Sequence, residues 1–124
     1  MLELPAGKIR EYENIFEALR REVKEETGLS ITKILGEDNQ ISNFIKGNEV
    51  ISYTPYCITQ NLSGAYSIIL NTFLCEAKRE LLTETNESQN IHWIKIEEFK
   101  KTLKNNPEKI FLLHINALQK YLGI

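Results

Sequence analysis

Residues 14–27 constrain the fold of this chain more than any other segment does. Asn14 is a good helix N-cap, and Glu17, three residues later, fits the spacing of a capping box. Gly28 stands where a helix C-terminus favours a residue that tolerates positive φ. The segment therefore predicts one helix with both ends fixed, so that the helical period sets which side chains share a face.

Acidic residues fall on the apolar face of this predicted helix. That face is formed by Ile15, Leu19 and Val23, with Ala18 at its border. On a helical wheel Glu22 and Glu26 lie inside the same arc, and Glu25 lies about 60° away at its edge. The helix therefore directs carboxylates toward the side that its apolar residues would bury.

A charge-rich helix is most often a solvated surface with ion pairs four residues apart, such as Glu17 with Arg21. That interpretation accounts for Glu17, Arg20 and Lys24 on the opposite face. It does not account for carboxylates on the apolar stripe, because buried carboxylates are normally neutralised, paired or bound to metal. Carboxylates within one turn repel each other and raise each other's pKa, and a divalent cation removes that repulsion. Such oxygen-rich clusters suit Mg²⁺ or Mn²⁺.

The remainder of the chain favours an α+β domain. Segments rich in β-branched and aromatic residues predict strands at 30–35, 50–58, 67–77 and 91–96. Loops are expected at 36–47, 61–64 and 83–90. A short helix is predicted over 96–103, and a second one starts at Asn106-Pro107 and ends at Gly123. Strands with helices at both ends are typical of layered α+β folds.

Composition indicates one soluble domain over residues 1–124. The chain is too short for two useful cores, and 15 Lys and Arg against 17 Asp and Glu give no reason to expect nucleic-acid binding. Its apolar runs are too short to span a bilayer, and its first residues lack a secretory pattern. Cys57 and Cys75 have no metal-ligand spacing and are expected to be buried thiols of a cytoplasmic protein.

The acidic helix lies within a longer motif. The pattern G-x5-E-x7-R-E-U-x-E-E-x-G-U, in which U is a bulky aliphatic residue, is filled by Gly7, Glu13, Arg21, Glu22, Val23, Glu25, Glu26, Gly28 and Leu29. This segment, residues 7–29, resembles the Nudix box of MutT-like hydrolases at every position. Chance agreement at the seven fixed positions is about one in 10⁸ at a given start. The resemblance implies a Nudix-type α/β/α sandwich with a mixed sheet.

The resemblance also implies a reaction. Nudix enzymes use Mg²⁺ or Mn²⁺ to hydrolyse a phosphoanhydride in nucleoside diphosphates linked to another moiety. By the match, Glu22, Glu25 and Glu26 would be metal carboxylates and catalytic residues, and the carbonyl of Gly7 would add a ligand. The ions would shield the diphosphate and position and acidify the attacking water.

Other positions receive structural or auxiliary roles from the same resemblance. Glu13, Arg21 and Gly28 would brace the loop–helix–loop, with Arg21 salt-bridged inside it. One of the box glutamates would serve as general base, or a further glutamate before the last strand would do so. Glu87 is the first candidate for that role and Glu84 the second, and an exposed loop acid is an equally good interpretation of Glu87.

The residues before the box bear on the substrate. Residues 2–9 resemble the corresponding segment of ADP-ribose pyrophosphatases, in which Pro-Ala-Gly is common. This favours ADP-ribose or another nucleoside diphosphate sugar. His92 and His114 lie among apolar neighbours without a second ligand at metal spacing, so both are expected to be structural.

The chain departs from the family in one respect. A Nudix domain normally has early strands before the box, whereas six residues precede it here, so the sheet is expected to be N-terminally truncated. The chain would be a fragment of a longer enzyme, a subunit whose sheet a partner completes, or a fold that closes on itself. A homodimer is expected if the chain is stable alone. The alternative to an enzyme is a catalytically silent Nudix-like module that binds a nucleotide or a protein.

Overall fold

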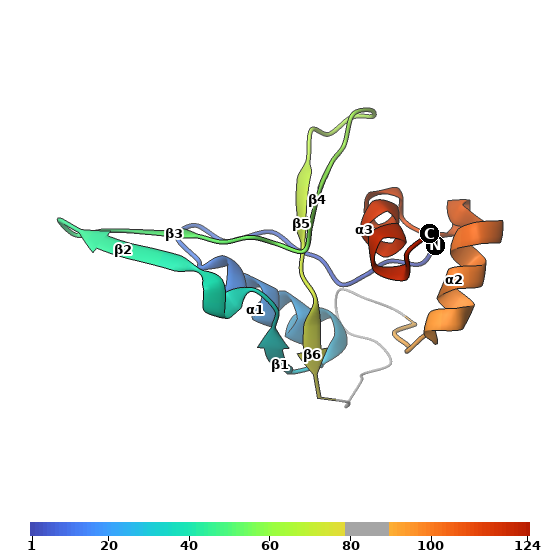
Figure 1. Cartoon of the computed structure of the whole chain (residues 1–124), viewed down its shortest axis with the longest axis horizontal. Helices are drawn as coiled ribbons and strands as arrows, with labels where there is room; N and C mark the ends of the chain where they lie inside the picture. Colours follow the sequence, from blue (N-terminus) through green and yellow to red (C-terminus); the bar gives the residue numbers. More distant parts are fainter. Residues whose placement is uncertain (79–89) are drawn as a thin grey trace.

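A computed structural model describes residues 1–78 and 90–124. Its helices are α1 (Ile15–Thr27), α2 (Ile96–Asn105) and α3 (Leu112–Leu122), with short 3₁₀ turns at Glu37–Asn39 and Pro107–Lys109. Its strands are β1 (Ile31–Ile34), β2 (Ile41–Ile45), β3 (Asn48–Ser52), β4 (Cys57–Gln60), β5 (Ile69–Thr72) and β6 (Cys75–Ala77). The hairpins β2–β3 and β4–β5 extend away from the helices in two directions (Figure 1). The α+β class predicted from the sequence is confirmed.

Helix α1 begins and ends where the sequence predicts. The Asn14 side-chain oxygen accepts a hydrogen bond from the Phe16 amide at 2.8 Å. At the other end Gly28 is left-handed with φ 81°, and its N–H donates to the carbonyl of Lys24 at 2.9 Å. Because both ends are satisfied locally, this helix has the same bounds in the fold as in the sequence pattern.

The strands pair differently from the single mixed sheet that was expected. Within the described residues they form three two-stranded antiparallel sheets, β1–β6, β2–β3 and β4–β5. A parallel bridge joins Leu2 to Ile110. The predicted strand 50–58 is interrupted around Pro55, which has no N–H to donate to a ladder. The predicted strand 67–77 is likewise divided, at Phe73-Leu74.

Two segments were assigned the wrong structure from the sequence. Residues 41–45, expected as loop, are β2, which meets β3 through a two-residue turn at Lys46 and Gly47. Both turn residues have positive φ, 53° and 81°, as a type I′ hairpin turn requires. Residues 91–95, expected as strand, have no regular structure, and Ile96 begins α2.

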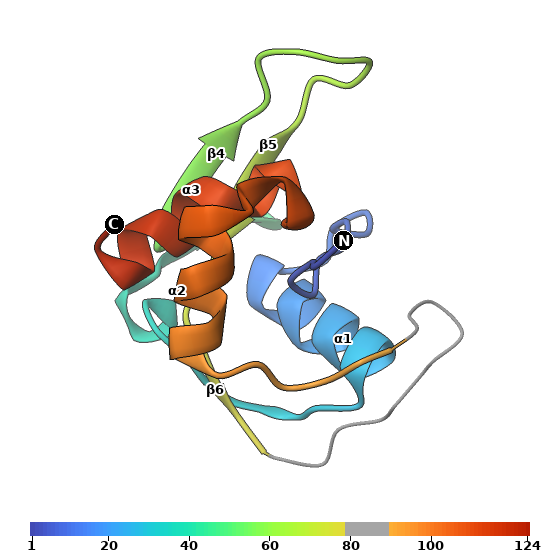
Figure 2. The same ribbon diagram turned by 90° about the vertical axis from the view of Figure 1, so that its right-hand side faces the viewer.

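The last helix starts later than predicted. Pro107–Lys109 form only a 3₁₀ turn, and α3 begins at Leu112. Between them the chain is extended, because the Leu2 N–H donates to the carbonyl of Lys109 at 2.7 Å and the Phe111 N–H donates to the carbonyl of Leu2 at 2.8 Å. A contact between the two ends of the chain therefore overrides the local helix signal. Figure 2 shows α2 and α3 beside each other, with α1 next to the N-terminal segment.

The aromatic core is built around Phe16, which is only 2% exposed. Its ring meets those of Tyr53 and Phe73 edge to face, with centroids 5.8 and 5.7 Å away. The predicted inward residues, including Ile15 and Leu19, are instead half-buried and line a cavity. The fully buried residues of α1 are Phe16, Ala18 and Thr27, so of the predicted inward face only its border residue Ala18 is buried in the core. No helix in the described part of the chain is long and apolar enough to cross a membrane.

Candidate active site at the acidic helix

The N-terminal segment is tied down at alternate residues. The Leu4 N–H donates to Nδ1 of His114 at 3.0 Å, and the Ala6 N–H donates to Oε2 of Glu26 at 2.9 Å. Since alternate amides of an extended chain face the same side, these bonds align the segment along α1 and α3. They place Gly7 directly beside the acidic face of α1.

Gly7 makes the closest approach at the site. A Cβ added there would overlap the carboxyl group of Glu22. Because position 7 is a glycine, the Glu22 side chain packs directly against the Gly7 backbone.

Arg21 holds the loop against the helix. Its Nε and Nη2 bind the two carboxylate oxygens of Glu13 at 2.8 and 2.9 Å, and Nη2 also donates to the carbonyl of Lys8 at 3.0 Å. The Arg10 N–H adds a bond to Glu13 at 3.0 Å. The hydrogen bonds from Arg21 and then from Arg10 lower the pKa of Glu13 to about 2, and Glu13 raises the pKa of Arg21. Arg21 thus joins α1 to the loop through Glu13 and Lys8.

The same guanidinium also binds two of the predicted metal carboxylates. Nη1 of Arg21 lies 2.6 Å from Oε1 of Glu22 and 3.3 Å from Oε2 of Glu25. Glu25 also lies 3.6 Å from Arg10. The side chain of Glu22 is 15% exposed and that of Glu25 is 37% exposed. Arg21 therefore pairs with Glu25, whereas the predicted partner, Glu17, is exposed and takes no part in the ion pairs of the described residues.

The carboxylates of Glu22, Glu25 and Glu26 do not converge on one point in the described structure. Within residues 1–78 and 90–124 no group of three or more His, Cys, Asp or Glu side chains is arranged to hold a metal ion. Arg21 orients Glu22 and Glu25, while Glu26 is turned toward the Ala6 amide. The donor set nevertheless fits a hard cation, because it consists of oxygens only and comes from one helical turn beside a backbone carbonyl. Shared coordination requires Glu22 and Glu25 to turn from Arg21.

The remaining candidate residues are Glu84, Glu87, His92 and His114. Of these, Glu84 and Glu87 lie outside the described residues. His114 is 4% exposed, packs against the ring of Phe111, and has its pKa lowered by burial. Because its Nδ1 accepts from the Leu4 amide, it supports the N-terminal segment. His92 is exposed, and its Nδ1 donates to the carbonyl of Asn90 at 2.8 Å.

Sequence reasoning missed an ion pair on the far side of α1. Arg20 was expected on the solvated face, but its Nη1 and Nη2 donate to the two carboxylate oxygens of Glu37 at 2.7 and 2.6 Å. These hydrogen bonds lower the pKa of Glu37 and raise that of Arg20. The pair fixes the turn after β1 against α1. Nothing local in the sequence predicts it, because the partners are 17 residues apart.

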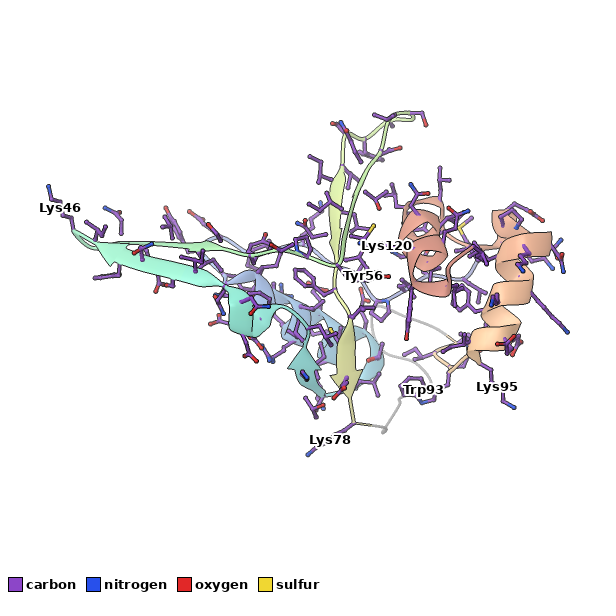
Figure 3. All side chains as sticks on the ribbon, in the orientation of Figure 1. Lys46, Tyr56, Lys78, Trp93, Lys95 and Lys120 are labelled. Carbon is purple, nitrogen blue, oxygen red and sulfur yellow. The ribbon has the colours of Figure 1, made fainter. Side chains whose placement is uncertain are left out.

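Two cavities border the box. One of about 580 Å³ is lined by Gly7 and Glu22 together with apolar residues of α1 and β5–β6. The other, about 1160 Å³, is lined by the N-terminal residues, Glu26 and α2. Trp93 lines both, just before α2 (Figure 3). Box acids therefore face spaces of the size that small-molecule ligands occupy.

The family model described as NUDIX domain matches residues 1–114, which include the acidic helix and its supporting loop. No curated protein and no solved structure shows a significant match to the chain. The family match and the complete box together show that this chain belongs to the Nudix family.

Proposed function

We propose that this protein is a Mg²⁺- or Mn²⁺-dependent pyrophosphohydrolase, built as one Nudix domain over residues 1–124. Its family indicates a hydrolase of nucleoside diphosphate derivatives. The observation that carries the proposal is the clamp at Arg21, which binds Glu13 on the loop and presents Glu22 and Glu25 on one helical turn. A chain that only needed a stable surface helix would gain nothing from such clustered acids.

The carboxylates of Glu22, Glu25 and Glu26 and the carbonyl of Gly7 would hold the ion. When bound, the ion would shield the charge of the diphosphate and lower the pKa of the attacking water. Gly7 lies against Glu22, which supports their joint role. Arg21 would hold Glu22 and Glu25 in position until they bind the ion.

The reaction itself needs a base and a leaving group. The water oxygen would form a bond to one phosphorus as the bridging P–O bond breaks, and the second phosphate would leave with the bridging oxygen. A carboxylate would accept the proton from water. The candidates for this base are the box glutamates Glu22, Glu25 and Glu26, and Glu87 with Glu84 as second choice.

ADP-ribose or another nucleoside diphosphate sugar is the proposed substrate. Residues 2–9 resemble the lead-in of ADP-ribose pyrophosphatases, and the cavity of about 580 Å³ beside Glu22 has room for part of such a molecule. Cys57 and Cys75 are free thiols, half-buried and exposed respectively rather than buried as expected, and the proposed location is the cytoplasm. A homodimer is the proposed assembly, with no nucleic-acid polymer and no membrane as partner.

The test is release of a nucleoside monophosphate from ADP-ribose and from a dinucleotide, with and without Mg²⁺. We expect turnover only with the ion, and we expect Glu25→Gln and Glu26→Gln each to abolish it. Glu17→Gln is the matched control, because Glu17 is an exposed acid on the same helix. Folded protein with no turnover across a broad nucleotide panel would overturn the proposal.

A silent binding module is the second candidate. It is favoured by one observation, that the Arg21 guanidinium forms ion pairs with both Glu22 and Glu25. Calorimetry separates the two candidates. A silent module would bind ADP-ribose without metal and leave it intact, whereas the enzyme would release products once Mg²⁺ is added.

A further inference from the structure

Two side chains hold the N-terminal segment (residues 2–7) beside the acidic site. Nδ1 of His114, on α3, accepts from the Leu4 amide at 3.0 Å, and Oε2 of Glu26, on α1, accepts from the Ala6 amide at 2.9 Å. The segment lies between these two helices (Figure 2). Its position therefore depends on an acceptor from each of them.

The two acceptors have different roles under the proposed function. Glu26 is one of the three carboxylates proposed to bind the ion, so its oxygens have to serve both the Ala6 amide and the ion. His114 belongs to the last helix and is not among the proposed ligands. It is therefore the acceptor that keeps the segment in place when Glu26 turns toward the ion.

The ring of His114 is fixed in its orientation. It is 4% exposed, and it packs edge to face against Phe111 with the ring centroids 5.0 Å apart. Because Nδ1 accepts from an amide N–H, the proton of the neutral ring lies on Nε2. Burial lowers the pKa of His114, which favours this neutral form. The side chain therefore presents one fixed acceptor to the segment.

The start of α3 is bound to the same segment through the main chain. The Leu2 N–H donates to the carbonyl of Lys109 at 2.7 Å, and the Phe111 N–H donates to the carbonyl of Leu2 at 2.8 Å. His114 lies in the first turn of α3, directly after this bridge. The bridge therefore sets the register in which His114 meets the Leu4 amide.

The segment is stiff between the bound amides and the acidic site. Pro5 lies between Leu4 and Ala6, its ring fixes its own φ, and it restricts Leu4 to extended backbone. The bound amides therefore determine the position of the next residue, Gly7. The Glu22 side chain packs directly against the Gly7 backbone.

We propose that His114 is a positioning residue for the acidic site: its hydrogen bond to the Leu4 amide holds Gly7 where the Gly7 carbonyl and the Glu22 carboxylate can bind one ion. The inference rests on the function proposed above. It adds a residue that lies 110 positions along the chain from its partner. Loss of a side chain that orients metal ligands commonly weakens metal binding by about 10- to 100-fold, and the same is expected here.

Substitutions at His114 separate the acceptor from the ring. His114→Asn places an oxygen as many bonds from Cα as Nδ1 is, so it should keep the hydrogen bond. His114→Gln places its oxygen one bond further, where Nε2 is, and His114→Ala has no acceptor. Ala117→Gly is the matched control, because Ala117 is buried in the same helix and glycine weakens that helix without removing the acceptor. Circular dichroism checks that each variant folds.

Mn²⁺ titration followed by electron paramagnetic resonance, without nucleotide, measures the site. We expect the dissociation constant to rise about tenfold in His114→Ala and His114→Gln, and to stay within about twofold of native in His114→Asn and Ala117→Gly. Amide hydrogen exchange of the metal-free protein should be faster at Leu4 in the two weakened variants alone.

Three results would overturn the proposal. One is native Mn²⁺ affinity in His114→Ala although exchange at Leu4 is fast. Another is equal weakening in His114→Ala and Ala117→Gly, which would make His114 a structural residue only. The third is failure of His114→Asn to restore the affinity. A native chain that binds Mn²⁺ but releases no product would contradict the proposed hydrolase instead, and would leave a role of His114 in ion binding supported by the titration.

Discussion

At the scale of single residues, close packing decides the geometry of the acidic site. Gly7 leaves room for the Glu22 carboxylate, because a methyl group at that position would overlap it. The overlap falls on the far end of a flexible side chain, which can swing aside. Substitution at Gly7 therefore acts on the position of Glu22 rather than on the fold.

We predict that Gly7→Ala lowers Mg²⁺-dependent turnover by about tenfold or more, equivalent to about 1.4 kcal/mol of transition-state stabilisation. The thermal midpoint should change little. Steady-state kinetics and a thermal melt measure the two effects. If Gly7→Ala acts through Glu22, combining it with Glu22→Gln should add almost nothing to the loss. Fully additive losses would contradict this assignment.

Glu13 makes stability depend on pH. Its pKa is about 2 in the folded protein against an ordinary 4.5, so its ion pair with Arg21 stabilises the fold fully above pH 4.5 and is lost as the pH falls toward 2. We predict that urea midpoints of the native chain and of Glu13→Gln differ at neutral pH and converge between pH 4.5 and 2. A difference that stays constant across this range would show that the carboxylate does not carry the effect.

At the scale of elements, α1 depends on its own termini. The Asn14 side chain satisfies the Phe16 amide, which otherwise has no partner within the helix. We predict that Asn14→Ala destabilises the protein by about 1 kcal/mol, while Asn14→Ser retains most of the stability. Chemical denaturation of both variants measures this. Equal losses in the two variants would mean that packing at this position, and not the cap, matters.

Considered as a whole, the molecule exposes apolar side chains on the β2–β3 hairpin, including Phe44, which is 70% exposed. If the proposed homodimer covers these side chains, folding and association are coupled. The thermal midpoint of the native chain should therefore rise with protein concentration, and that of Phe44→Asp should not. Differential scanning fluorimetry over a wide concentration range measures this, and a midpoint independent of concentration would contradict coupling.

Local sequence pattern was enough to predict α1, its caps and the acidic motif. Asn14 and Gly28 act on backbone groups of the same helix, and the period of that helix sets which carboxylates are neighbours. The order of the box, from Gly7 to Leu29, was sufficient to identify the family that the comparison then showed. All of these features rest on interactions over short distances along the chain.

The buried core, the start of the last helix and the orientation of the box carboxylates depend instead on contacts between distant segments. Phe16, not the arc of Ile15, became the buried centre, because Tyr53 and Phe73 arrive on that side from distant segments. Hydrogen bonds between Leu2 and residues 109–111 keep that segment extended, so the last helix starts later than predicted. Arg21 binds the carboxylates of Glu22 and Glu25, and the described residues contain no group of acids arranged around one metal position. Each outcome depends on partners far apart in sequence or on competition among neighbouring charges, and local pattern carries no information about either.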